Sequence, residues 1–238
     1  MTLKSPKLFL LDIEGTVAPM SLVYDELFPY ARAHFESYLH SHSGEQGVVN
    51  DLTALAEESA AETDQGAPKF ANPGFWDEAL PYLNWLMDHD RKSTALKSLQ
   101  GRIWKGGFER GELKGTLFED VPAALERWSG AGHVAIYSSG SVAAQMLLFR
   151  YSSFGDLTDR ISGYFDTRTG KKTAVASYVS IANAMDCEPR QVMFFSDTIR
   201  ELDAAREAGC HTRIVMREGN APVDDAHGHR KIKSFDLL

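Results

Sequence analysis

The sequence predicts an α/β fold, a doubly wound parallel sheet with a helical domain inserted after its first strand. Three observations lead to this prediction. Strand-like apolar runs occur near the start of the chain and again after about residue 130, whereas residues 20–115 carry apolar side chains mostly at helical spacing. The strand-like runs end at acidic or hydroxyl residues. Parallel sheets bind ligands beyond the carboxyl ends of their strands, so these endings also indicate where chemistry takes place.

The first predicted strand is the apolar run Leu8–Leu11, which is typical of a strand buried on both faces. Asp12 follows it directly, two residues before Glu14, and Gly15 lets the backbone turn away. An aspartate in this place can act as a nucleophile toward phosphorus while the second acid handles a proton. The same residues also suit an ordinary strand-to-turn junction, and this motif alone leaves both interpretations open.

The middle of the chain predicts a helical cap domain. Four segments have apolar residues at helical spacing, and they are residues 24–40, 48–61, 75–89 and 93–109. The large aromatic residues of this region are expected to form its core, and they are Trp76, Tyr82, Trp85 and Trp104. We therefore expect an α/β core formed by residues 1–19 and 116–238 and a cap formed by residues 20–115, which shields the site from water when it closes.

A second predicted strand, residues 134–137, ends at hydroxyl residues before a helical pattern over residues 142–149. Hydroxyl groups and free backbone N–H groups at a helix N-terminus can seat a phosphate, so Ser138 and Ser139 are candidate phosphate ligands. A plain loop with a helix cap has the same sequence pattern.

Two further signals follow along the chain. Lys171 and Lys172 open a helical pattern, and a lysine there can neutralise a phosphate oxygen, although most such lysine pairs are simply solvated. A third strand, residues 191–196, ends at Asp197, with Glu201 one helical turn later. Carboxylates opposite Asp12 predict a Mg²⁺ site, because Mg²⁺ prefers oxygen ligands and keeps several waters.

The order of these signals is an acid pair, a hydroxyl loop, a lysine and a second acidic strand end, and it resembles the haloacid dehalogenase superfamily of phosphohydrolases. Six short segments further resemble the bifunctional enolase-phosphatases of methionine salvage, and they are residues 12–16, 27–31, 111–113, 137–142, 165–167 and 201–205. The resemblance covers about residues 7–220. Its most specific point is Glu14, because the wider superfamily mostly carries aspartate there.

The resemblance implies a role for each acidic candidate. Asp12 would be the nucleophile that becomes an aspartyl phosphate, and its carboxylate would also touch Mg²⁺. Asp197 would be the other carboxylate ligand of the ion. Glu14 would present its backbone carbonyl to the ion, while its side chain reaches a substrate proton. Glu201 would orient the waters of the metal.

The resemblance also assigns the phosphate ligands and the reaction. Ser138, Ser139 and Lys172 would bind the phosphate, and Lys172 aligns with the phosphate-binding lysine better than Lys171. The implied reaction is enolisation of 2,3-diketo-5-methylthiopentyl-1-phosphate followed by dephosphorylation to the acireductone 1,2-dihydroxy-3-keto-5-methylthiopentene.

Two alternatives stay open. Another phosphatase of the same superfamily, acting on a sugar phosphate or a nucleotide, would use the same motifs and differ only in its cap. A phospho-acceptor signalling module, which is not an enzyme, also combines strand-end acids, a hydroxyl and a lysine. The long helical insert argues against this module, because a phospho-acceptor does not need to cover its aspartate.

Composition agrees with a small-molecule enzyme. The chain has 238 residues and a net charge of −8, which argues against nucleic acid as a partner, since binding to phosphate backbones needs a concentrated basic surface. Cys187 and Cys210 lack the spacing of a metal site or a disulfide framework, so we expect packing residues in a reducing compartment. The first residues include no long apolar run, which predicts neither a signal peptide nor a membrane span. We expect a cytoplasmic protein acting on a small phosphate ester, and the family resemblance suggests a monomer.

Overall fold

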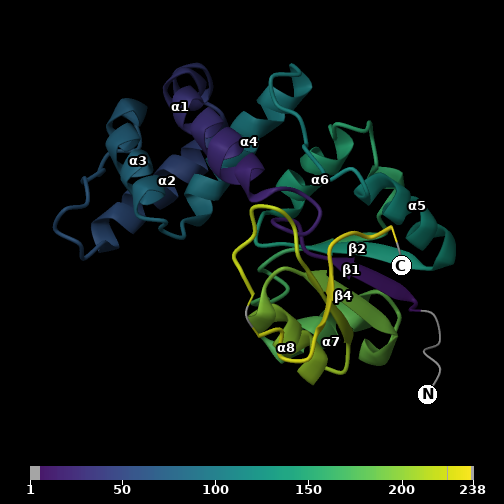
Figure 1. The fold of residues 1–238 in the computed structure, drawn as a ribbon. Helices are drawn as coiled ribbons and strands as arrows, with labels where there is room; N and C mark the ends of the chain where they lie inside the picture. Colours follow the sequence, from purple (N-terminus) through teal and green to yellow (C-terminus); the bar gives the residue numbers. More distant parts are fainter. Residues whose placement is uncertain (1–5, 224, 237–238) are drawn as a thin grey trace. The chain divides into compact units, whose positions relative to one another are not determined.

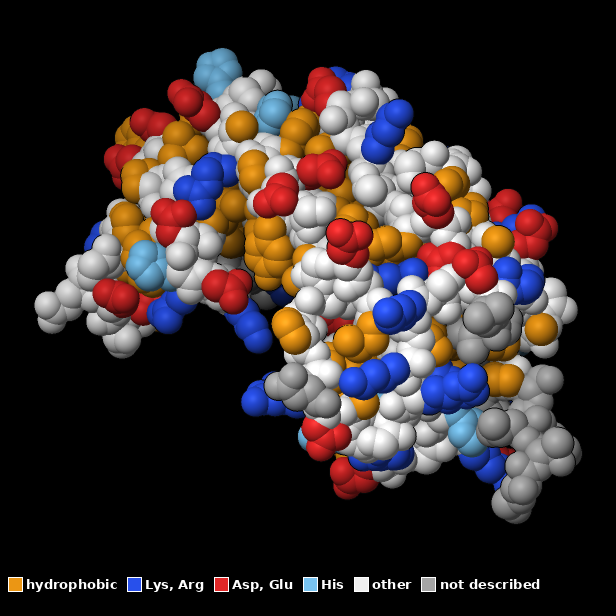
Figure 2. Space-filling model, viewed as in Figure 1, with side chains coloured by type: hydrophobic (Ala, Val, Ile, Leu, Met, Phe, Trp, Pro, Cys, Tyr) orange, Lys and Arg blue, Asp and Glu red, His pale blue; other side chains and the backbone are white. Residues whose placement is uncertain are grey.

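The computed structural model describes residues 6–223 and 225–236. The chain divides into two compact units, one formed by Met1–Val23 with Lys114–Leu238 and the other by Tyr24–Leu113. The first unit contains all the strands of the described residues, and the second contains only helices. Figure 2 shows hydrophobic, acidic and basic side chains interspersed on the visible face of each unit.

The α/β unit is built on a six-stranded sheet in which every neighbouring pair of strands is parallel. The strand order is β3-β2-β1-β4-β5-β6. The strands are β1 (Leu8–Leu11), β2 (His133–Tyr137), β3 (Gly163–Phe165), β4 (Val192–Ser196), β5 (His211–Val215) and β6 (Arg230–Ile232). This order confirms the predicted doubly wound sheet. The winding direction changes between β1 and β4, and such switch points are where open α/β sheets bind ligands.

Helices cover both faces of this sheet. They are α5 (Val121–Ala131), α6 (Val142–Arg150), α7 (Val175–Ala184) and α8 (Ile199–Glu207). Figure 1 shows α5 and α6 on one face and α7 and α8 on the other. Two short 3₁₀ helices, Thr158–Arg160 and Pro189–Gln191, lie in the connections. Because the sheet is covered on both sides, its central strands can be apolar along their whole length, as the sequence of β1 predicts.

The register of the sheet positions the residues that follow the central strands. Leu11 pairs with Ile136 of β2 and with Phe195 of β4. The backbone N–H of Asp12 donates to the carbonyl of Phe195 at 3.0 Å. Asp12 therefore leaves the sheet level with the last residues of β2 and β4, and the loops that follow the three strands begin at one edge.

The helical unit has its own hydrophobic core. Its elements are α1 (Phe28–His42), α2 (Gln46–Ala61), the 3₁₀ helix Trp76–Glu78, α3 (Ala79–Asp88) and α4 (Thr94–Glu109). These helices confirm the four predicted from apolar spacing, and a π-helical turn, Leu22–Leu27, precedes α1. Tyr82 and Trp85 are buried in this core, with Trp76 and Trp104 packed against it.

Two further expectations concern single features. Cys187 and Cys210 are free thiols that pack with the core of the α/β unit, as the sequence predicts. In the described part of the chain, no helix combines the length and the apolar character needed to cross a bilayer.

Candidate active site

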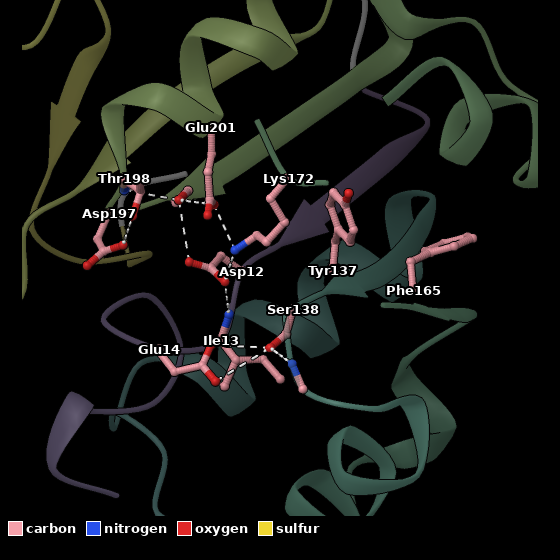
Figure 3. Close-up of polar contacts among 12 residues, drawn as sticks. Asp12, Ile13, Glu14, Tyr137, Ser138, Phe165, Lys172, Asp197, Thr198 and Glu201 are labelled. Atoms are coloured by element: carbon pink, nitrogen blue, oxygen red, sulfur yellow. Dashed lines mark hydrogen bonds and ion pairs between the residues drawn. The ribbon is translucent and has the colours of Figure 1, made fainter. Parts of the chain in front are cut away.

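Asp12 lies at the switch point with its carboxylate almost fully buried, since the residue is 3% exposed. Its Oδ1 atom accepts a hydrogen bond from the N–H of Ile13 at 2.8 Å. The ammonium nitrogen of Lys172 lies 2.5 Å from the same oxygen. Figure 3 shows these groups meeting at the end of β1. A carboxylate oxygen placed at a ligand-binding edge can act as a nucleophile.

Lys172 sits between two carboxylates. Its ammonium nitrogen lies 2.7 Å from Oε2 of Glu201 as well as against Asp12, and its side chain is 10% exposed. Burial by itself would lower the pKa of Lys172, but the negative charges of Asp12 and Glu201 raise it above the ordinary value. The lysine therefore carries a permanent positive charge beside Asp12.

The backbone before α7 decides which lysine enters the site. The hydroxyl of Tyr178 donates to the carbonyl of Lys172 at 2.6 Å, and the hydroxyl of Ser177 donates to the carbonyl of Lys171 at 2.8 Å. Both donors belong to the first turn of α7, so this helix fixes the backbone of the two lysines. The Lys172 side chain is directed to Asp12, whereas Lys171 is an exposed residue.

Glu201 is held by two partners in the α/β unit. Besides Lys172, it accepts a hydrogen bond from the hydroxyl of Ser196 at 3.0 Å. Burial raises the pKa of Glu201, Asp12 adds to this effect, and Lys172 partly offsets it. The contacts of Glu201 in the structure are thus to a lysine and a serine, and its role in orienting the waters of a metal stays a prediction.

Asp197 follows β4 and lies against the turn after Asp12. A Cβ atom added to Gly15 would lie 2.4 Å from Oδ2 of Asp197, so only glycine leaves room for this carboxylate. Gly15 also has a φ of +69°, a conformation that side chains disfavour. Burial raises the pKa of Asp197 to about 6, and the charge of Asp12 contributes to this shift.

Glu14 turns its side chain toward the loop after β2. The hydroxyl of Ser138 lies 3.2 Å from Oε2 and 3.5 Å from Oε1 of Glu14. Burial raises the pKa of Glu14, the charge of Asp12 raises it further, and Lys172 acts in the opposite direction. The side chain of Glu14 is thus a weakly acidic group that faces a hydroxyl.

The loop after β2 presents one buried and one exposed serine. Ser138 is fully buried and its Oγ accepts a hydrogen bond from the N–H of Gly140 at 3.1 Å, whereas Ser139 is exposed. The amide of Gln145 on α6 donates to the carbonyls of Gly140 and Phe165, both at 2.8 Å. Helix α6 therefore holds this loop in place from behind.

The donor set suits a divalent cation that binds oxygen. Asp12 and Asp197 are two carboxylates close enough for one to raise the pKa of the other, and a cation between such groups relieves their repulsion. No three His, Cys, Asp or Glu side chains in the described ranges form a metal cluster. A Mg²⁺ site does not require three such side chains, because two carboxylates and a backbone carbonyl can bind the ion while it keeps several waters.

Six of the seven candidate residues belong to one connected group. They are Asp12, Glu14, Ser138, Lys172, Asp197 and Glu201, joined by the contacts described above or by the repulsion between Asp12 and Asp197. Ser139 is the next residue of the same loop and lies exposed beside this group. Four carboxyl groups, a lysine and two serines are therefore gathered at one edge of the sheet.

Comparisons with known proteins support the same chemistry. The model of the haloacid dehalogenase-like hydrolase family matches residues 6–209. An enolase-phosphatase E1 of Synechococcus elongatus is 50% identical over 230 residues, which are 96% of each chain. Another, from Leptospira borgpetersenii, is 43% identical over 231 residues, which are 97% of each chain. The chain belongs to the enolase-phosphatase E1 family of the haloacid dehalogenase-like hydrolases.

A solved structure shares the fold of this chain. The UTR4 protein of Saccharomyces cerevisiae is 34% identical in sequence and matches with a TM-score of 0.79. The match covers 98% of this chain and 100% of the yeast chain. Membership of the enolase-phosphatase family confirms the family resemblance predicted from the six short sequence segments.

Sequence reasoning missed the residues that hold the candidate groups in this enolase-phosphatase. Ser196 donates to Asp12 Oδ2 at 3.4 Å as well as to Glu201, and the hydroxyl of Tyr137 donates to the carbonyl of Gly170 at 2.9 Å. A polar residue at the end of an apolar strand was the one available signal for Ser196. The Tyr137 hydroxyl gave none, because tyrosine is also an ordinary core residue.

Proposed function

We propose that this protein is an acireductone synthase, which enolises 2,3-diketo-5-methylthiopentyl-1-phosphate and then removes its phosphate. The observation that carries the proposal is the buried Asp12 carboxylate, held by Lys172 at the switch point of the sheet and adjoined by Glu14 and Asp197. The close relatives named enolase-phosphatase support the same assignment.

The phosphatase step would use Asp12 as the nucleophile. An oxygen of Asp12 forms a bond to phosphorus while the bond from phosphorus to the ester oxygen breaks, and the leaving oxygen takes a proton from Glu14. Water then attacks phosphorus, gives a proton to Glu14 and releases inorganic phosphate with the free carboxylate. Lys172 would neutralise a phosphate oxygen, and Ser138 and Ser139 would hold the others.

The enolase step would use Glu14 as the proton carrier. The raised pKa of its carboxyl makes Glu14 a stronger base than an exposed glutamate. It would take the carbon-bound proton next to the substrate carbonyl and deliver a proton to the carbonyl oxygen. Glu14 would then take up a proton from solvent water before the phosphatase step. The hydrogen bond from Ser138 would fix its orientation during this transfer.

We propose Mg²⁺ as the cofactor, held by the carboxylates of Asp12 and Asp197 and by the backbone carbonyl of Glu14. When bound, the ion would shield the phosphate from the charge of Asp12 and polarise the substrate carbonyl. Glu201 would orient the waters of this ion, and it would also have a second role. Its bond to Lys172 supports a function in holding the lysine against Asp12.

The remaining features complete the proposal. The helical unit, residues 24–113, would act as the cap that limits access of water. The net charge of −8 and the interspersed charges in Figure 2 favour a small phosphate ester over nucleic acid as the partner. We propose a cytoplasmic monomer.

Product analysis tests this function. The purified protein with Mg²⁺ and the diketone phosphate should release one phosphate per substrate and form the acireductone, visible by its ultraviolet absorbance. A panel of sugar phosphates and nucleotides serves as the comparison. Efficient turnover of an ordinary sugar phosphate without conversion of the diketone phosphate would contradict the proposal, and a phosphorylated Asp12 that persists in water would favour the phospho-acceptor alternative.

A further inference from the structure

The turn that follows Asp12 is closed by its own backbone N–H groups. The carbonyl of Ile13 accepts hydrogen bonds from the N–H groups of three consecutive residues, Thr16, Val17 and Ala18, at 2.9 to 3.1 Å. The N–H of Gly15 donates to the carbonyl of Ala18 at 2.8 Å. These bonds leave the carbonyls of residues 15, 16 and 17 directed away from the turn, where other parts of the chain can bind them.

Each of these three carbonyls is bound by a group that is distant in the sequence. The amide Nδ2 of Asn220 donates to the carbonyl of Gly15 at 2.9 Å. Nε of Arg217 donates to the carbonyl of Thr16 at 3.2 Å. The N–H of Phe118 donates to the carbonyl of Val17 at 3.0 Å. The turn is therefore held from outside at three successive residues.

The Arg217 side chain is held by two aromatic rings and a carboxylate. Its guanidinium lies 4.4 Å from the ring centre of Phe118 and 4.7 Å from that of Phe235. Nη1 pairs with Asp120 at 2.9 Å, and the side chain is 7% exposed. A guanidinium held between two rings and a carboxylate has little freedom, so its bond to Thr16 fixes the position of that carbonyl.

A second turn, formed by residues 217–220, positions Asn220 beside the turn that follows Asp12. The N–H of Asn220 donates to the carbonyl of Arg217 at 3.2 Å, and Gly219 between them has a φ of +87°. The same Asn220 amide donates to the carbonyl of Val215, the last residue of β5, at 3.3 Å. This segment therefore connects the end of β5 to the turn after β1.

Asn220 also approaches the candidate metal ligands. A Cβ atom added to Gly15 would lie 2.9 Å from Oδ1 of Asn220 and 2.4 Å from Oδ2 of Asp197. The two side chains thus reach the same side of Gly15, one residue after Glu14. Any movement of this turn would displace the Glu14 carbonyl relative to Asp12 and Asp197.

We infer that Asn220 and Arg217 are positioning residues, which hold the turn after Asp12 so that the Glu14 carbonyl and the carboxylates of Asp12 and Asp197 converge. This inference rests on the proposed function for the role of those three groups. Residues 217–220, which follow β5, would thus support the active site by binding the carbonyls of Gly15 and Thr16. Neither side chain needs to touch the substrate. Outer partners of metal ligands typically change metal affinity or activity by about 10–100-fold when they are removed.

The test compares Asn220→Asp, Asn220→Ala and Arg217→Lys with two control variants. Asn220→Asp keeps the shape and one oxygen but removes the N–H donor to Gly15. Lys231→Ala removes a bond from the Lys231 ammonium to the carbonyl of Val223, and Arg206→Ala removes one from a guanidinium to the carbonyl of His227. The controls thus lose the same kinds of contact in the same unit, away from the turn.

Three readouts are measured for each variant. They are Mg²⁺ affinity by titration calorimetry, kcat and KM for p-nitrophenyl phosphate, and hydrogen exchange at the N–H groups of residues 15–18 in metal-free protein. We expect all three substitutions to weaken Mg²⁺ binding by about 10–100-fold, lower kcat more than they raise KM, and speed exchange in the turn. Lys231→Ala and Arg206→Ala should leave these readouts unchanged.

Two results would overturn the inference. One is an Asn220→Asp variant with wild-type Mg²⁺ affinity and turn protection, because the donor would then be dispensable. The other is a loss of thermal stability in the variants with unchanged exchange at residues 15–18, which would make the role purely structural. If Asn220→Ala fails to fold, Arg217→Lys decides by the same readouts. Hydrogen exchange in metal-free protein does not depend on the substrate, so failure of the proposed reaction remains distinguishable.

Discussion

The ammonium of Lys172 lies 2.5 Å from Oδ1 of Asp12, across 160 residues of sequence. This contact brings the cation of one loop onto the carboxylate of another at the centre of the sheet. Because Lys172 also pairs with Glu201, the positive charge is held in place before any substrate arrives. Preorganised charge of this kind stabilises phosphoryl transfer without the cost of reorganisation during the reaction.

The two neighbouring lysines provide a matched pair of variants. We predict that Lys172→Met weakens binding of the phosphate ester and lowers kcat/KM by about 100-fold or more, because it removes the cation beside Asp12. Lys171→Met should have little effect, since Lys171 is exposed. Steady-state kinetics with the diketone phosphate measures both. A larger loss for Lys171→Met would show that Lys171, rather than Lys172, binds the phosphate.

Glu14 is predicted to contribute to metal binding through its backbone carbonyl and to proton transfer through its side chain. Glu14→Asp keeps the backbone carbonyl but shortens the side chain by one methylene, so it should retain Mg²⁺ binding while slowing enolisation by about 100-fold. Stopped-flow absorbance follows the enol, and a phosphate assay follows hydrolysis. Ser138→Ala removes the hydroxyl that contacts Glu14 and should give a smaller loss in the same step. Equal rates of enol formation in Glu14→Asp and wild type would exclude this role.

The ion pair between Arg217 and Asp120 predicts that the free energy of unfolding depends on pH in the acidic range. Burial would raise the pKa of Asp120, but the hydrogen bond from Arg217 and the other bonds it accepts lower it below the ordinary 3.8. The pair therefore stabilises the fold fully above that value, and the contribution disappears as pH falls through the lower pKa of the folded state.

Asp120→Asn measures this contribution. At neutral pH the variant should lose about 3 kcal/mol of free energy of unfolding, because a buried cation is left without its partner. The difference from wild type should shrink as pH falls below about 4. Urea unfolding at several pH values provides the measurement. A gap between variant and wild type that stays constant from neutral to acid pH would contradict the sign of the shift.

The sequence contains enough information to predict the framework of the site. The unbroken apolar run of β1 predicts burial on both faces, and burial on both faces implies a parallel sheet whose strand ends share one edge. From this it follows that Asp12, Ser138 and Asp197 approach one another. The cap helices are equally predictable, because apolar residues at helical spacing need a core to pack against.

The partners of the candidate residues are not predictable in the same way. Glu201 lies one helical turn after Asp197, and this spacing does not show that it also meets Lys172. That contact depends on the bonds from Ser177 and Tyr178 that hold the backbone before α7. The hydrogen bonds from Arg217 and Asn220 to backbone carbonyls leave no pattern in the sequence, because a residue of any type has a backbone carbonyl. Such contacts depend on the tertiary position of a segment rather than on its residue types.

The central claim is that phosphate passes through the side chain of Asp12, and chemical trapping tests it most directly. The protein is mixed with Mg²⁺ and the diketone phosphate, quenched during turnover and treated with borohydride, which reduces an aspartyl phosphate to homoserine. Peptide mass spectrometry should find homoserine at position 12 only when substrate was present, and Asp12→Asn should show neither the modification nor phosphate release while keeping the thermal stability of a folded protein. Phosphate release from wild type with an unmodified Asp12, or with the modification on another residue, would contradict the account.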